Sequence, residues 1–404
     1  MLSVTQNKTA QLGVVGLAAA LMGIGQNGLL VSLPFLVEQS AFSLSTWSIL
    51  IAVGSLLFLP SAPYWGRYSD RYGPKTVVTK ALAGMAISFL LLTLFAFLSK
   101  GQETWLSVYL AGLLLARIIY GCTVSGMVPA SQHWAIILCG ENNRLQAITS
   151  VSIGLSTGRL IGPLISILAL KMSPYAPLMV MVALPCFALL AALYLPAPKI
   201  ESSSGSNDKQ ALPWFPEKKL LPFLISGLLL CAAIALLQYS FSPLISTITS
   251  WTTAQISDAI GVLLTVSAAC TFATQLLVIK KKKLSPLAMY RMGSLCLAFG
   301  FMLFLTENIW IFGIAMTIVA CGAALLVPAY TCSATEQQQD SPGAVAGYIS
   351  MFHTIGYGVA SLLAFSATIS ANYPVYLCVM FAIAIGILAY FFAGKRRTEE
   401  LKAY

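Results

Sequence analysis

The sequence predicts an all-α polytopic membrane protein in which 12 transmembrane helices form two pseudo-symmetric six-helix bundles. The first observation is composition. Of the 404 residues, 58% are hydrophobic and only 9% are Asp, Glu, Lys or Arg, whereas soluble domains carry about 25% charged residues. The second is that the apolar residues gather in long runs, and the third is that one hydrophilic stretch divides these runs six and six. This composition excludes a cytosolic enzyme, a disordered regulator and a nucleic-acid-binding protein.

Each expected span has about the 20 mostly apolar residues that a helix needs to cross the hydrocarbon core. In chain order the first six lie at residues 12–37, 47–64, 77–98, 105–128, 147–170 and 176–195. The last six lie at residues 220–245, 258–279, 286–305, 309–330, 344–367 and 374–393.

The hydrophilic stretch at residues 199–218 includes the run Glu-Ser-Ser-Ser-Gly-Ser-Asn-Asp at 201–208. Small polar residues without an apolar period cannot pack a core, so this stretch is predicted to be a flexible cytoplasmic linker. The chain is therefore expected to consist of an N-terminal six-helix bundle at 1–198 and a C-terminal one at 219–404.

The basic residues predict the orientation, because Lys and Arg concentrate in cytoplasmic loops. With the N-terminus inside, 19 of the 23 basic residues fall in inner segments, only Lys100 and Lys171 fall outside, and Arg117 and Arg159 fall within spans. Both termini are thus expected to be cytoplasmic, in the plasma (inner) membrane. The first apolar run is too long for a cleavable signal peptide and is expected to stay in the mature protein. Most of the net charge of +10 is a topology signal.

A short sequence repeat indicates that the halves are related. Met-Val-Pro-Ala at 127–130 ends the fourth span, and Leu-Val-Pro-Ala at 326–329 ends the tenth. Two related six-helix halves are typical of transporters, which bind substrate at the midplane between the halves. Chance similarity between apolar helices is the alternative.

The loop expected between the second and third spans reads Gly-Arg-Tyr-Ser-Asp-Arg-Tyr-Gly-Pro-Lys at 66–75. Glycine permits close backbone approach and a positive φ, and an Asp is stabilised by a helix N-terminus. The segment resembles motif A of the major facilitator superfamily, Gly-x-x-x-Asp-Arg/Lys-x-Gly-x-Arg/Lys. The resemblance implies a charge lock that closes the inner side in one state, made by Gly66, Asp70, Arg71, Gly73 and Lys75. Asp70 is expected to accept from Arg71 and to sit against a helix N-terminus of the opposite half.

Arg117, with Gly121 four residues later, lies near the middle of the fourth span and resembles motif B of the same superfamily, Arg-x-x-x-Gly. An Arg inside a bilayer is costly, so its side chain is expected to face the bundle interior or a wet cavity. Snorkelling to the interface is the alternative.

The fifth span contains Gly154, Gly158, Gly162 and Pro163. This pattern is similar to motif C, which marks the drug/proton antiporter branch and implies export, although Ile and Ser at 165–166 replace its usual terminal glycine pair. Glycines repeated every four residues are also explained by a close helix contact without any role in export.

Polar residues at helical spacing are predicted to line the substrate cavity. For any single Ser or Tyr, a local bond to the backbone is an equally good explanation. The predicted binding residues are Gln26, Asn27, Arg117, Ser152, Ser156, Arg159, Gln238, Tyr239, His353 and Tyr357.

All 13 acidic residues lie outside the expected spans or at their ends. A cavity that holds Arg117 and Arg159 without a carboxylate is net positive and favours an anionic substrate. The same absence argues against proton coupling through a carboxylate. His353 is therefore a hypothetical proton carrier, or else a polar lining residue.

We predict a monomeric, proton-coupled exporter of a small organic anion, such as a carboxylate-type siderophore. The alternatives are a polyspecific multidrug antiporter and a non-transporting receptor or assembly factor. No metal or other cofactor and no enzymatic activity are expected, because the nine cysteines are scattered singly and no catalytic or phosphate-binding motif appears. The expected partners are the substrate, protons and the lipid bilayer.

Overall fold

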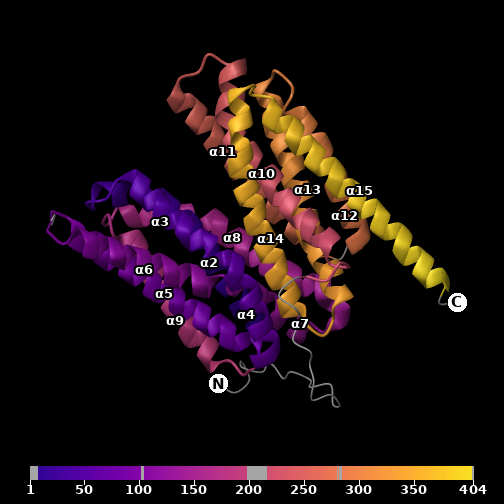
Figure 1. The fold of residues 1–404 in the computed structure, drawn as a ribbon, viewed down its shortest axis with the longest axis horizontal. Helices are drawn as coiled ribbons and strands as arrows, with labels where there is room; N and C mark the ends of the chain where they lie inside the picture. The colour runs from indigo at the N-terminus through magenta and orange to yellow at the C-terminus, as the bar shows by residue number, and fades with distance from the viewer. Residues whose placement is uncertain (1–7, 102–103, 198–215, 280, 282–283, 403–404) are drawn as a thin grey trace. The chain divides into compact units, whose positions relative to one another are not determined.

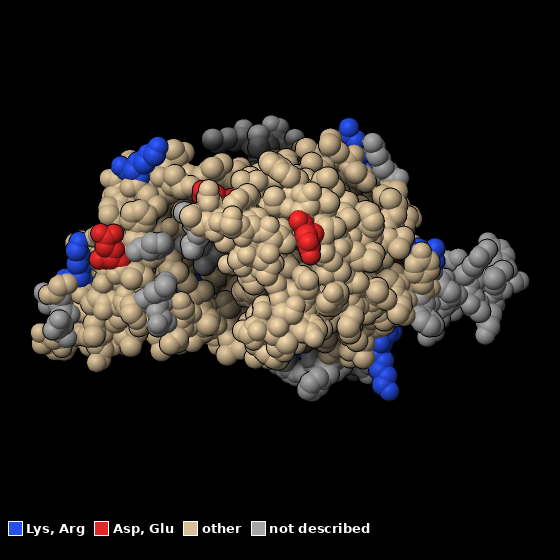
Figure 2. All heavy atoms as spheres, turned by 90° about the horizontal axis from the view of Figure 1, so that it is seen from above, with Lys and Arg blue, Asp and Glu red and all other residues tan. Residues whose placement is uncertain are grey.

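The computed structural model describes residues 8–101, 104–197, 216–279, 281 and 284–402 (Figure 1). Within these residues, 12 helical segments are long and apolar enough to cross a membrane, and no residue is in a β-strand. The predicted all-α fold with 12 spans is confirmed. Charged side chains are sparse on the face drawn in Figure 2.

The first six spans contain eight α-helices, because the second and fourth spans are each built from two consecutive helices. They are α2 (Lys8–Glu38), α3 (Leu44–Leu56) with α4 (Phe58–Tyr72), α5 (Pro74–Ser99), α6 (Leu106–Val124) with α7 (Met127–Cys139), α8 (Arg144–Leu170) and α9 (Ala176–Tyr194).

The last six spans begin with α10 and end with α15. They are α10 (Leu221–Ile248), α11 (Thr253–Thr274) with a π-helical extension (Gln275–Ile279), α12 (Pro286–Leu303), α13 (Ile309–Gln337), α14 (Pro342–Leu363) with a 3₁₀ extension (Ala364–Thr368), and α15 (Tyr373–Lys402).

Three spans extend well past the ends predicted from hydropathy. The predicted ends at 64, 128 and 330 become Tyr72, Cys139 and Gln337. Beyond residue 128 the fourth span continues as a second helix, α7, which has Pro129 in its first turn. Beyond residues 64 and 330 the chain is polar, so hydropathy does not mark these turns, although the backbone hydrogen bonds of the helices continue through them. The expectation that 66–75 forms a loop is therefore wrong. Residues up to Tyr72 are helical, and the turn is confined to Gly73, whose φ is +89° and which precedes Pro74 at the start of α5.

By their internal contacts the residues divide into two compact units. The first comprises residues 1–215 and 338–351, and the second comprises residues 216–337 and 352–404. The first turns of α14 thus belong to the first unit. The predicted linker at 199–218 lies, from 199 to 215, outside the described residues, and the bundle boundaries at 1–198 and 219–404 stay predictions.

In each unit, the helices of the first and the fifth span approach closely through glycine. In the first unit α8 packs along α2, where a Cβ on Gly158 would strike the carbonyl oxygen of Ala20. In the second unit α14 lies against α10, where a Cβ on Gly356 would strike the carbonyl oxygen of Leu228. The two halves therefore repeat the same kind of helix contact.

Candidate functional site

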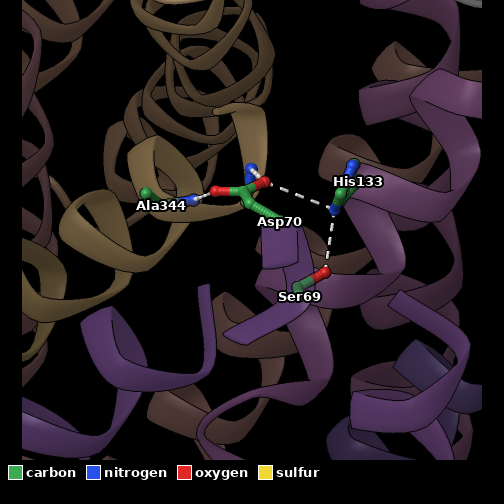
Figure 3. A network of polar contacts seen from close by, with 5 residues as sticks. Ser69, Asp70, His133 and Ala344 are labelled. Carbon is green, nitrogen blue, oxygen red and sulfur yellow. Dashed lines mark hydrogen bonds and ion pairs between the residues drawn. The ribbon is translucent and has the colours of Figure 1, made fainter. Parts of the chain in front are cut away.

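Asp70 lies near the C-terminal end of α4 and caps the first turn of α14, within the first unit (Figure 3). Its two carboxylate oxygens accept separate backbone bonds, from the N–H of Gly343 at 2.8 Å and of Ala344 at 2.7 Å. The first N–H groups of a helix have no intrahelical acceptor, and Pro342 has no N–H to offer. The carboxylate therefore satisfies the first two available donors and carries the charge that a helix N-terminus favours.

Glycines bring the two backbones close enough for these bonds. A Cβ on Gly66 would strike the carbonyl oxygen of Gly343, and a Cβ on Gly343 would lie 2.6 Å from the carbonyl oxygen of Gly66. Any side chain at either position would push α4 and α14 apart. Gly66, which is predicted to allow close backbone approach, thus lies against Gly343. The hydrogen bonds from the Gly343 and Ala344 N–H groups to Asp70 depend on this close contact.

Two residues that the sequence reasoning did not select complete this network. His133 of α7 places Nδ1 2.8 Å from the Ser69 hydroxyl and 3.5 Å from the Asp70 carboxylate (Figure 3). Ser69 is fully buried and His133 is 6% exposed. The available signal was weak: His133 is one of only two histidines in the chain.

The remaining basic residues of the motif contact other groups. Lys75 donates to the carbonyl oxygens of Leu193, at 3.0 Å, and Leu195, at the C-terminal end of α9. A cation is favourable there because the last carbonyls of a helix carry partial negative charge. The Arg71 guanidinium lies 5.3 Å from the centre of the Tyr72 ring.

Arg117 of α6 is buried inside the first unit, with 4% of its surface exposed. Its Nε donates to the Leu50 carbonyl of α3 at 3.4 Å, and its guanidinium lies 4.7 Å from the centre of the Tyr120 ring. Nη1 has no hydrogen-bond partner among the described residues. The ring offsets part of the cost of burying the charge. Protein groups therefore surround Arg117, and substrate binding by it stays a prediction.

The glycine stripe of α8 forms the contact with α2. Gly154 approaches the Gly16 carbonyl, and Gly162 approaches the Ile24 Cα; Pro163 follows inside the helix. The amide of Asn27 reaches across and donates to the Arg159 carbonyl oxygen at 2.9 Å. The Arg159 side chain itself is exposed.

The other predicted lining residues differ in accessibility. In the first unit Ser152 is buried and donates locally to the Ile148 carbonyl, as the alternative explanation holds, while Gln26 and Ser156 are half-buried. In the second unit Gln238 and Tyr239 on α10 and Tyr357 on α14 are exposed.

His353, also on α14, is half-buried and holds a specific partner. Its Nε2 lies 2.6 Å from the hydroxyl of Tyr330, which is fully buried on α13. Gly227 on α10 lies beside the imidazole, because a Cβ there would come within 2.9 Å of Nε2. The Tyr330 hydroxyl and the backbone at Gly227 therefore both help to fix the position of the His353 ring.

Comparison with known proteins gives a family match over most of the chain. The family model described as Major Facilitator Superfamily matches residues 15–361. "Multidrug resistance protein MdtG" of Proteus mirabilis is 29% identical over 157 residues, which cover 38% of this chain and 36% of that protein. "Tetracycline resistance protein, class D" of Salmonella ordonez is 27% identical over 208 residues, which cover 50% of this chain and 49% of that protein. The chain thus matches half or less of the length of these relatives.

Solved structures match over nearly the whole chain. The human organic anion transporter MFSD10 (TETRAN) has a TM-score of 0.70 at 18% identity, covering 94% of this chain and 98% of that one. A variant of the fucose:proton symporter FucP of E. coli has a TM-score of 0.72 at 15% identity, covering 96% of this chain and 99% of that one. At these identities the likeness shows the shared fold alone.

Proposed function

This chain belongs to the major facilitator superfamily, and we propose that it is a secondary active transporter that exports a small organic anion in exchange for protons. Alternating access between two related halves is the mechanism that this fold uses in general. Asp70, bonded to the first turn of α14, would then hold one of the alternating states, and breaking its two bonds would allow the other.

The observation that carries the choice of substrate is the distribution of charge along the spans. Arg159 is exposed at the middle of α8. The acidic residues within the spans are Asp70, Asp258 and Glu336, and each lies within three residues of a span end. A cation inside a membrane protein is costly unless it is paired. An anionic substrate supplies the partner for Arg159, whereas a cationic substrate has no carboxylate to bind inside the spans.

Arg159→Ala is therefore expected to reduce accumulation of radiolabelled citrate in inside-out membrane vesicles by about tenfold or more. A hydrogen bond to a charged group contributes ~1.5–3 kcal/mol, and each 1.4 kcal/mol is about a factor of ten. Arg159→Lys should retain part of the uptake, because it keeps the charge. Lys171→Ala, which removes an exposed cation just after the same helix, is the matched control and should transport normally. Unchanged citrate uptake by Arg159→Ala would contradict the anion assignment.

We propose His353 as the proton carrier, because a titratable side chain bonded to a buried tyrosine hydroxyl is suited to exchange a proton. His353→Gln keeps a polar side chain that can reach Tyr330 but cannot titrate near neutral pH. It is expected to lose citrate uptake driven by a pH gradient while keeping citrate–citrate exchange without a gradient. Gradient-driven uptake equal to the wild type would leave His353 as a lining residue only.

Polyspecific drug efflux is the second candidate, favoured by the names of the relatives, which are multidrug and tetracycline resistance proteins. The glycine stripe ending in Pro163 also fits it through the resemblance to motif C. In the same vesicles, uptake of tetracycline that persists in Arg159→Ala, together with no uptake of citrate by the wild type, would favour this function over anion export.

A further inference from the structure

In the second unit, α12 and α15 leave an open apolar groove of about 400 Å³ between them. Its floor is made of small residues one turn apart: Ser294 and Ala298 on α12, and Ala382 and Gly386 on α15. Leucine and isoleucine side chains that are each about half exposed form the walls, Leu295 on α12 and Ile383 and Ile387 on α15. The groove follows the helices within two membrane spans, Pro286–Leu303 and Tyr373–Tyr390.

A cation lies at one end of this groove. The guanidinium of Arg291, one turn before Leu295, lies 4.8 Å from the centre of the Tyr390 ring, which also lines the groove. Its Nε is buried and has no hydrogen-bond partner among the described residues. The ring holds the cation in place without neutralising it, so the guanidinium can still bind an anion.

The position of this cation matches the position of a lipid headgroup. Tyr390 lies one turn before the end of the apolar run of α15, which continues to residue 393 in the sequence, and aromatic side chains near such ends favour the membrane–water interface. The helix continues to Lys402 and carries Lys395, Arg396 and Arg397 in its sequence. Basic residues beside a membrane surface attract anionic lipids, and basic pockets between transmembrane helices bind their headgroups.

We propose that this groove is a binding site for one anionic phospholipid. The phosphate pairs with Arg291, and an acyl chain lies along the floor over Ser294 and Gly386. A zwitterionic lipid such as phosphatidylcholine would pair with Arg291 more weakly, because its choline cation offsets the charge of its phosphate, and a free phosphate would satisfy only the cation. The site lies apart from the residues assigned to transport, so it stands or falls independently of the exported substrate.

Two substitutions test the cation and the apolar groove of this site independently. Arg291→Gln removes the cation and leaves the groove. Gly386→Leu fills the groove and leaves the cation; it has room, because a Cβ on Gly386 would lie 3.5 Å from the Ser294 hydroxyl, an ordinary contact. The matched controls are Lys281→Gln, an exposed cation of the same unit, and Gly313→Leu, a glycine of α13 with nothing within 4 Å of its Cβ.

Binding to the full-length protein in detergent is measured by native mass spectrometry, with dioleoyl phosphatidylglycerol, dioleoyl phosphatidylcholine and glycerol phosphate as probes. The wild type should bind phosphatidylglycerol about tenfold or more tightly than either other probe, since the charge-assisted bond to Arg291 adds to the apolar contact only for this lipid. Arg291→Gln should lose this preference, Arg291→Lys should keep most of it, and Gly386→Leu should weaken both lipids. The controls should match the wild type.

Three results would overturn the proposal. Equal affinity of the wild type for the two lipids would show that the net charge of the headgroup does not contribute to binding. Glycerol phosphate bound as tightly as phosphatidylglycerol would assign the cation to a soluble anion. Unchanged phosphatidylglycerol binding in both Arg291→Gln and Gly386→Leu, with folding verified by unchanged thermal unfolding, would place the lipid elsewhere.

Discussion

Asp70→Asn is expected to reduce transport by about tenfold or more while the protein still folds. The substitution keeps the shape of the side chain but replaces one acceptor oxygen by an NH₂ group. One of the two N–H groups, of Gly343 or Ala344, then faces a donor instead of an acceptor. Losing a bond to a charged group costs ~1.5–3 kcal/mol, and losing an anion at a helix N-terminus adds ~0.3–1 kcal/mol. The conformation in which Asp70 caps α14 is therefore less populated, and transport, which needs both alternating conformations, slows down.

This prediction is checked by citrate uptake into inside-out vesicles, with protein amounts matched by quantitative blotting. Asp258→Asn is the matched control, because Asp258 is an exposed acid near the start of α11; its uptake should equal that of the wild type. If Asp70→Asn transports as fast as the wild type, the bond between α4 and α14 has no role in the transport cycle.

Gly158→Leu is expected to abolish folding of the protein into the membrane, and Gly158→Ala to lower its thermal stability. A Cβ at this position falls on the carbonyl oxygen of Ala20, which is backbone and cannot rotate away. Overpacking a tight contact costs ~1–3 kcal/mol, and separating α8 from α2 also removes the bond from Asn27 to the Arg159 carbonyl.

The measurement is the yield of monodisperse protein after extraction, followed by thermal unfolding of the Ala variant. Gly13→Leu on α2 is the control, because nothing lies within 4 Å of its Cβ; it should be obtained in wild-type yield. A wild-type yield and unfolding temperature for Gly158→Leu would show that α2 and α8 are not packed through this stripe.

Much of the fold follows from the sequence, since lipid exposure imposes a simple rule on composition. Long apolar runs located all 12 spans. Glycines spaced four apart indicated a close helix contact on α8, and the partner proved to be α2. Both features arise from local sequence, because a helix face is defined by residues a few positions apart.

The features that local sequence did not reveal depend on contacts between distant segments. The polar ends of α4 and α13 are helical although few of their residues are apolar. His133 contacts Asp70 although the two residues lie far apart in the sequence. Nothing near His133 in the sequence distinguishes this polar contact from ordinary core packing. For Arg117 the sequence predicts only that the side chain faces the bundle interior or a wet cavity, whereas its contacts with Leu50 and Tyr120 place it between helices of the first unit.

Hydrogen exchange at the first turn of α14 shows directly whether the Asp70 carboxylate caps this helix. Mass spectrometry of peptides covering residues 338–351 reports the backbone N–H groups of Gly343 and Ala344 in the wild type and in Asp70→Asn. We expect slow exchange in the wild type and exchange about tenfold or more faster in Asp70→Asn, confined to this turn. Equal exchange rates in the two proteins would contradict this expectation, because the amides would then be protected by something other than Asp70.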